Sequence, residues 1–277
     1  MHDPVTTISL LILTLLSMAA WGVMALRLGH DDPISPEAPR GRYRRIQYSL
    51  VGLLTTLAGL LFVYRAIFVN EAWRPLSSHV DGLLLIAALL SGAVLFLQTG
   101  RRLPEFSGFA LPILTVLLAW AICASSWTFE PFEIGTVWKT FHLASVYLGV
   151  MAVSMSAVGG GMYLYLRKRL HRKADLASPR RFGSLEATEG LIRSTSILGF
   201  VMITLALITG LVIQLDAPEK LGKGWWYSSH IVLPIIAWVL YALLINVRHS
   251  STFRGARAAW LSIAGLVLLL VTLGVAR

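Results

Sequence analysis

The stretch STSILGFVMITLALITGLVIQL, residues 194–215, contains no charged side chain. A helix that crosses the hydrocarbon core of a membrane needs about 20 mostly apolar residues, and this stretch meets that requirement. Seven other runs are similarly apolar. The sequence therefore predicts an all-α polytopic membrane protein, a single integral membrane domain over residues 1–277. Its eight transmembrane helices are expected at about 5–26, 46–69, 79–98, 108–127, 137–166, 191–215, 229–247 and 258–276.

Composition supports the same fold class. The chain is 56% hydrophobic and 14% charged, with a mean hydropathy of +0.70, which a water-soluble domain of this length could not bury in one core. Cys123 is the only cysteine, so a disulfide framework, a CxxC pair, an iron–sulfur site and a CxxCH haem attachment site are all excluded. Small residues recur at helical spacing along 137–166, which favours close helix packing there.

Basic residues predict the orientation of the chain in the membrane. When alternate loops are assigned to alternate sides, one side holds 18 of the 24 lysines and arginines and the other holds 6. The basic side is expected to be cytoplasmic, which places both termini outside and indicates a bacterial cytoplasmic (inner) membrane protein with an uncleaved first helix. The basic stretch 167–173 is expected to be a cytoplasmic stop in contact with anionic lipid. The sequence has no surface of interleaved basic and aromatic residues, so it does not suggest nucleic-acid binding.

Histidines are the candidate ligands. Three of them lie near the predicted outer ends of their helices, about 27 to 37 Å from the basic residue that follows each helix: His79, His142 and His230. A histidine at a membrane interface can simply be half solvated there. Three at one depth favour a shared ligand.

Haem fits these residues better than zinc. Zinc needs three or four close His, Cys or carboxylate ligands, whereas haem needs two axial imidazoles, apolar walls and cations for its propionates. Trp225 and Trp226 precede His230 and are candidate walls, although an aromatic belt also places tryptophans at a membrane interface. His142 and His230 are the predicted iron ligands, and His79 is the reserve.

Arg65 is a cation inside an otherwise apolar stretch. It either snorkels to the interface or meets an anion. The anion would be a haem propionate, which Lys139 or Lys223 could also serve, or an outer-side acid. The acids considered are Glu71, Glu130 and Glu133.

Two stretches resemble a known family. Residues 183–210, GSLEATEGLIRSTSILGFVMITLALITG, are similar to the "SLE … GF … T … L.TG" run of the CcsA/CcmC cytochrome c assembly family, whose relatives include HemX-type proteins. Residues 221–230, LGKGWWYSSH, resemble that family's "WGxxWxWDPK" segment, and Trp238, Tyr241 and Arg248 fall on its "W..Y......R" continuation. Helix count and length are closest to HemX-like members.

The resemblance implies haem binding on the outer side, with His142 before the tryptophan-rich segment and Gly222 and Trp225 within it. The chain departs from the family at Tyr227–His230, where Trp-Asp-Pro-Lys is expected, and at Asn246, where histidine is common. The leading hypothesis is therefore haem holding and transfer to apocytochrome and other maturation subunits, rather than catalysis by this chain alone. The alternatives are a HemX-like regulatory or assembly subunit and, less favoured, a transmembrane haem electron carrier.

Overall fold

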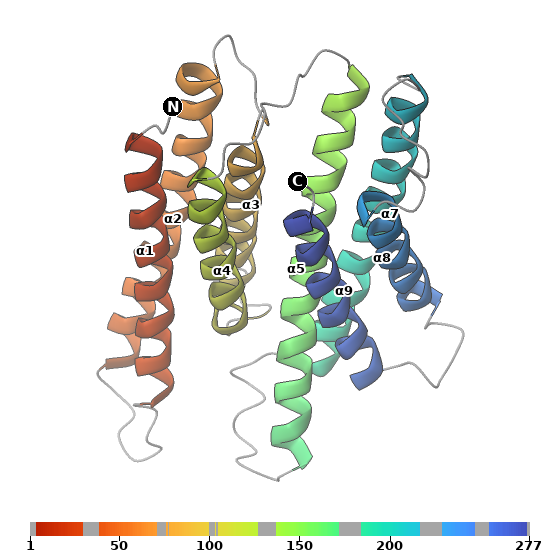
Figure 1. Cartoon of the computed structure of the whole chain (residues 1–277). Helices are drawn as coiled ribbons and strands as arrows, with labels where there is room; N and C mark the ends of the chain where they lie inside the picture. Colours follow the sequence, from red (N-terminus) through yellow and green to blue (C-terminus); the bar gives the residue numbers. More distant parts are fainter. Residues whose placement is uncertain are drawn as a thin grey trace. The chain divides into compact units, whose positions relative to one another are not determined.

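The computed structural model describes residues 4–29, 39–70, 76, 78–99, 103, 105–126, 137–171, 184–216, 229–246 and 255–275. Within these ranges every regular element is helical, so the all-α prediction with eight α-helices is confirmed (Figure 1). The elements are α1 (Pro4–Gly29), α2 (Pro39–Tyr64), the π-helix η1 (Arg65–Val69), α3 (His79–Thr99), α4 (Ser107–Ser126), α5 (Val137–His171), α7 (Leu185–Asp216), α8 (Ser229–Asn246) and α9 (Ala256–Val275).

Six of these helices are long and apolar enough to cross a membrane, and α8 and α9 are shorter apolar helices. Many large apolar side chains face outward, including Leu15 and Leu60, each 64% exposed. Water would penalise such a surface, but hydrocarbon tails solvate it. The chain is a polytopic membrane protein, as its sequence predicts.

Helix ends extend beyond the apolar runs. α2 begins at Pro39 rather than near residue 46, and α5 continues to His171. α7 begins at Leu185, where the backbone N–H of Ala187 donates to the Ser184 hydroxyl at 3.0 Å and Glu186 occupies the first turn. The sequence predicts this N-cap. Hydropathy locates only the lipid-facing part of a helix, because backbone hydrogen bonding continues into the polar region.

Contacts divide the described chain into two compact units. Unit 1 consists of 1–131 with 181–183, and unit 2 of 132–180 with 184–277. In unit 1 each helix packs on its neighbours in the chain and α4 packs on α1, which closes a four-helix ring. In unit 2 the order α5, α7, α8, α9 closes in the same way, with α9 on α5. The sequence alone predicts one domain and carries no signal for this division.

Close helix approach in unit 2 relies on the small residues of α5. A Cβ at Gly159 would lie 2.9 Å from the Ile192 side chain of α7, and one at Gly160 would lie 2.7 Å from the Ala259 carbonyl oxygen of α9. Without these side chains the backbones approach closely, and dispersion contacts replace the hydrophobic drive that lipid cannot supply. The predicted packing role of this stripe is confirmed.

Polar side chains join the helices of unit 1. Ser17 of α1 and Thr115 of α4 share a hydrogen bond of 2.8 Å, and the Gln47 amide of α2 donates to the Ser107 hydroxyl at 2.5 Å. Hydrogen bonds of this kind between membrane helices contribute about 0.6 kcal/mol on average. These two bonds favour one rotation of α1, α2 and α4 about their axes.

Candidate functional site

His142 lies in the second turn of α5 and faces the last third of α7. Its Nδ1 is 2.9 Å from the backbone carbonyl oxygen of Ala206 and 3.2 Å from the Thr209 hydroxyl. The side chain is half-buried, and no hydrogen bond of Nε2 occurs among the described residues. Structure and sequence therefore both place this imidazole at the N-terminal end of α5, the predicted outer end.

Gly210 of α7 lies directly against the His142 ring. A Cβ at position 210 would be 3.0 Å from Cε1 and 3.3 Å from Nδ1 of that ring, closer than most real contacts of this kind. The ring can occupy this position because Gly210 has no side chain. Contacts at Ala206, Thr209 and Gly210, which lie within about one turn of α7, thus define one side of the imidazole.

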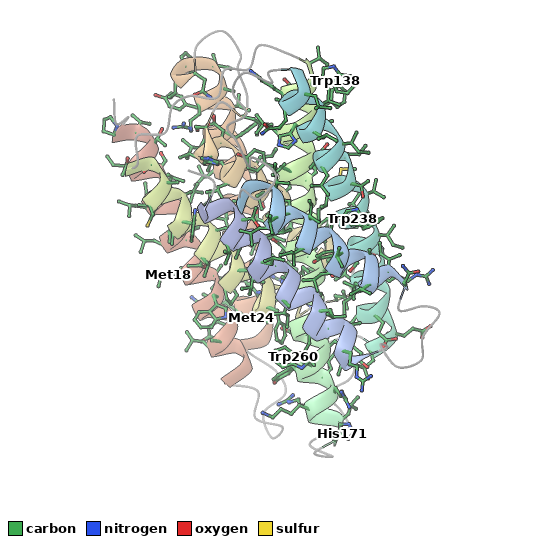
Figure 2. The ribbon with its side chains drawn as sticks, turned by 45° about the vertical axis from the view of Figure 1, so that its right-hand side comes forward. Met18, Met24, Trp138, His171, Trp238 and Trp260 are labelled. Carbon is green, nitrogen blue, oxygen red and sulfur yellow. The ribbon has the colours of Figure 1, made fainter. Side chains whose placement is uncertain are left out.

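Trp238 shows which parts of α8 and α7 lie side by side. Figure 2 labels this residue on α8. Its indole N–H donates to the Thr204 hydroxyl at 2.9 Å, and its ring stacks on Phe200 with centroids 5.5 Å apart. Consecutive packed membrane helices run antiparallel, so His230, which precedes Trp238 on α8, lies near the level of Val212 on α7. The His230 backbone and the His142 ring are therefore at the same end of unit 2.

The His230 side chain lies outside the described residues, as do Trp225 and Trp226. The predicted pairing of His142 with His230 beside two tryptophans stays a prediction. Trp138, by contrast, is described at the start of α5, at the end opposite His171 (Figure 2). It is 53% exposed, as expected of an aromatic residue at a membrane interface.

A buried ion pair occupies the predicted outer end of unit 1. Arg65 Nε donates to Asp81 Oδ1 at 2.6 Å, and the guanidinium also donates to the hydroxyls of Thr6 at 3.0 Å and Ser78 at 3.1 Å. The other carboxylate oxygen of Asp81 accepts from the Asn70 amide at 2.8 Å. Charge and hydrogen bonds are thereby matched in a place where an unpaired ion would be very costly.

Asp81 also caps α3 and fixes the backbone of His79. The Ser78 N–H donates to Asp81 Oδ2 at 3.1 Å, and the Asp81 N–H donates to the Ser78 hydroxyl at 3.3 Å. This reciprocal pair is a capping box, with Ser78 as N-cap and His79 as the first helical residue. His79 is half-buried at the same end of unit 1 as this ion pair.

The π-helix η1 brings Arg65 into this network. Its end is closed by a hydrogen bond of 2.9 Å from the Asn70 N–H to the Arg65 carbonyl, five residues earlier. A π turn holds an extra residue, and such turns are rare and concentrated at functional sites. Arg65 is buried here while Phe68 is 70% exposed.

The partner of Arg65 is a finding that sequence reasoning missed. The sequence offers Glu71, Glu130 and Glu133 as acids, and all three lie outside the described residues, whereas the observed partner is Asp81. The spacing of residues along the sequence does not reveal this pair, because Arg65 lies in η1 and Asp81 lies in α3. The Ser-x-x-Asp pattern at 78–81 is the available signal, since it marks a capping box.

The residues around His142 were also missed as partners. Thr209 and Gly210 end the 183–210 stretch that carries the family resemblance, but nothing in a single sequence shows that they face His142.

No group of three or more His, Cys, Asp or Glu side chains suited to a metal ion occurs in the described part of the chain. Cys123 is exposed on α4.

Two rings of apolar helices, one with an oriented imidazole near an end, define a polytopic helical membrane protein with a candidate ligand site in unit 2. A family described as "Cytochrome C assembly protein" matches residues 49–276. This match spans both units and most of the chain, so the chain belongs to the cytochrome c assembly protein family.

Several curated relatives are similar along nearly the whole chain. A cytochrome c biogenesis protein CcsA from Prochlorococcus marinus (strain MIT 9312) is 25% identical over 299 residues, covering 98% of this chain and 90% of the relative. Its namesake from Synechococcus sp. (strain RCC307) is 22% identical, covering 93% of this chain and 89% of the relative. No solved structure matches the chain significantly.

Proposed function

We propose that this chain handles haem during cytochrome c assembly in a bacterial cytoplasmic membrane. It holds haem at the outer face of unit 2, with His142 and His230 as axial ligands, and presents it to a partner. Family membership and the names of the relatives support the process. The orientation of the His142 ring supports haem as the ligand, and it is the single observation that carries the proposal.

The donor set of His142 fits haem iron. An axial imidazole coordinates through a nitrogen with a free lone pair, while its other nitrogen donates a hydrogen bond to the protein. In His142, Nδ1 donates the hydrogen bond to the Ala206 carbonyl. Nε2 is therefore left to coordinate the iron. When bound, haem supplies an iron that accepts this lone pair, and the protein determines where and in what orientation.

The remaining groups of the proposed site also come from unit 2. His230 begins α8 at the same end as His142, and Trp225 and Trp226 precede it as candidate walls for the porphyrin. Arg65 already faces Asp81, so the propionates are assigned to Lys139 or Lys223. In unit 1, His79 stays the reserve ligand.

Holding and transfer fit the sequence better than attachment does. The family's Trp-Asp-Pro-Lys core is replaced by residues 227–230, which removes the acidic group expected of a full haem lyase. The competing function is a HemX-like regulatory or assembly subunit that acts through partner contacts at the basic segment 167–193. Both functions place the chain in the same pathway, but they depend on opposite ends of unit 2.

Haem titration tests the leading proposal. The purified protein is reconstituted with haem and scanned for a Soret band, alongside His142→Ala, His230→Ala and the control His171→Ala, which alters an exposed histidine at the far end of α5. We expect a Soret band in wild type and His171→Ala, with loss or a change to a five-coordinate spectrum in the other two. Absence of binding by wild type, or unchanged spectra in both ligand variants, would overturn the proposal.

Cytochrome c maturation in cells separates the two functions. If the chain holds haem, His142→Ala abolishes maturation and neutral replacements of Arg167, Lys168 and Arg169 are tolerated. If it is a regulatory subunit, the pattern reverses. The three basic residues lie at the C-terminal end of α5, far from His142 along the same helix.

A further inference from the structure

We infer that Ala206, Thr209 and Gly210 are positioning residues that commit His142 to one tautomer and aim its Nε2 at a ligand. The inference rests on the proposed function, because the ligand it serves is haem iron. None of the three residues is assigned a role by the family match or by the relatives. Each contributes a different physical constraint.

The Ala206 carbonyl fixes the tautomer. A carbonyl oxygen can only accept a hydrogen bond, so at 2.9 Å the His142 Nδ1 must carry the proton. The Thr209 hydroxyl already donates to the Leu205 carbonyl at 2.7 Å, which leaves its lone pairs to accept from the same N–H. The neutral ring therefore presents an unprotonated Nε2, the form that a metal ion requires.

Gly210 fixes the position of the ring. With a Cβ in its place, Cε1 would be only 3.0 Å away, so the ring would have to move by a few tenths of an ångström. Such a shift stretches or bends the bond between Nδ1 and Ala206. The absence of a side chain at Gly210 thus leaves room for the ring position in which Nδ1 reaches the Ala206 carbonyl, and this hydrogen bond determines the tautomer.

This arrangement also affects the strength of the metal bond. An N–H···O=C bond on the remote nitrogen raises the basicity of a coordinating imidazole, and loss of such partners typically costs about 10- to 100-fold in metal affinity. A more basic ligand favours ferric over ferrous haem. The reduction potential therefore reports on the Ala206 contact separately from overall folding.

A first experiment needs no haem. Long-range proton–nitrogen NMR correlations of 15N-histidine-labelled protein in detergent, at a pH where imidazole is neutral, assign the protonated nitrogen of each ring. His142→Gln identifies the relevant signals by their loss. We expect His142 to be protonated at Nδ1 in wild type. Predominant protonation at Nε2 would overturn the inference even if haem binds.

The second experiment compares two glycines of α7. Gly210→Ala is paired with Gly190→Ala, because a Cβ at position 190 meets nothing within 4 Å. We expect Gly210→Ala to weaken haem binding about 10- to 100-fold and to raise the reduction potential of the residual complex, whereas Gly190→Ala matches wild type. Thr209→Val keeps its volume and serves if Gly210→Ala fails to fold; it should shift the potential in the same direction.

Chemical rescue completes the test. His142→Gly is supplied with imidazole or with 1-methylimidazole, and the low-spin haem spectrum is titrated. Imidazole retains an N–H for the Ala206 carbonyl and 1-methylimidazole does not, so we expect imidazole to rescue at about tenfold lower concentration. Equal rescue by both, together with a wild-type spectrum in Gly210→Ala, would refute the positioning role. Unchanged haem spectra in both His142→Ala and His230→Ala would instead refute the proposed function.

Discussion

The carboxylate of Asp81 on α3 lies 2.6 Å from Arg65 Nε in η1, and this ion pair is almost completely shielded from solvent. Burying both charges removes the hydration of each, so mutual attraction offsets a cost already incurred and adds little net stability. Removing one charge is different, because the other is left uncompensated. The pair is therefore a sensitive point in unit 1.

Arg65→Ala is expected to destabilise unit 1 by about 3 to 5 kcal/mol, because it leaves Asp81 charged and buried. The double variant Arg65→Leu, Asp81→Leu should be closer to wild type than Arg65→Leu alone or Asp81→Leu alone. The matched control is Arg44→Ala, an exposed arginine on α2, for which we expect a change within about 0.5 kcal/mol. Denaturation in detergent measures the stability of wild type and of each variant. Equal stability of Arg65→Ala and Arg44→Ala would contradict the assignment.

Gly160→Ala is expected to destabilise unit 2 by about 1 to 3 kcal/mol, because the new methyl group would collide with the backbone of Ala259 and with the Ser262 hydroxyl. Gly59→Ala on α2 is the control, since a Cβ there meets nothing within 4 Å. That change should be neutral or stabilising, because alanine favours a helix by about 0.5 to 1 kcal/mol over glycine. Thermal melting of the purified proteins distinguishes the two; a lower midpoint for Gly59→Ala than for Gly160→Ala would argue against this packing.

Trp238→Phe should cost about 0.6 kcal/mol, since it removes the hydrogen bond to Thr204 and keeps a ring to stack on Phe200. Trp238→Ala removes both interactions and should cost more. Trp260→Phe is the comparison, because Trp260 is 62% exposed on α9 (Figure 2). Chemical denaturation gives the ranking, and a larger effect at Trp260 than at Trp238 would contradict the contact between α7 and α8.

The charge distribution predicts where the ends of the chain lie. Alkaline phosphatase, which is active only outside the cytoplasm, should be active when fused after Arg277 and inactive when fused within 172–183. A fluorescent protein that folds only inside should give the reverse pattern. Activity of the phosphatase at 172–183 would invert the topology and move the His142 end of unit 2 to the cytoplasmic side.

Sequence reasoning recovered the helices because lipid imposes one requirement on every span, a long apolar run with all backbone groups bonded internally. The N-cap at Ser184 was predictable for a similar reason, since capping depends on local spacing. Helix ends in water were less predictable. No hydropathy step marks Pro39 or His171, where the backbone continues as helix beyond the lipid.

Contacts between helices were not predictable, because spacing along one chain does not set the rotation of neighbouring helices. The sequence leaves Arg65 to snorkel or to meet an anion, and the pairing with Asp81 depends on a π turn that no composition rule signals. His142 was identified from its depth and from the family resemblance. Its orientation by Ala206 and Gly210 arises only when α5 and α7 pack together.

The closure of each four-helix ring on itself has a genetic consequence. Among the described helices, the larger sets of contacts all lie within one unit or the other. A substitution in one unit is therefore expected to damage mainly that unit. Inactivating alleles should sort into two classes. Those in the first ring would lower the amount of protein without altering the spectrum of any bound haem, and those near His142 would alter the spectrum at normal abundance. A random mutant collection scored for both traits would map the boundary between the rings.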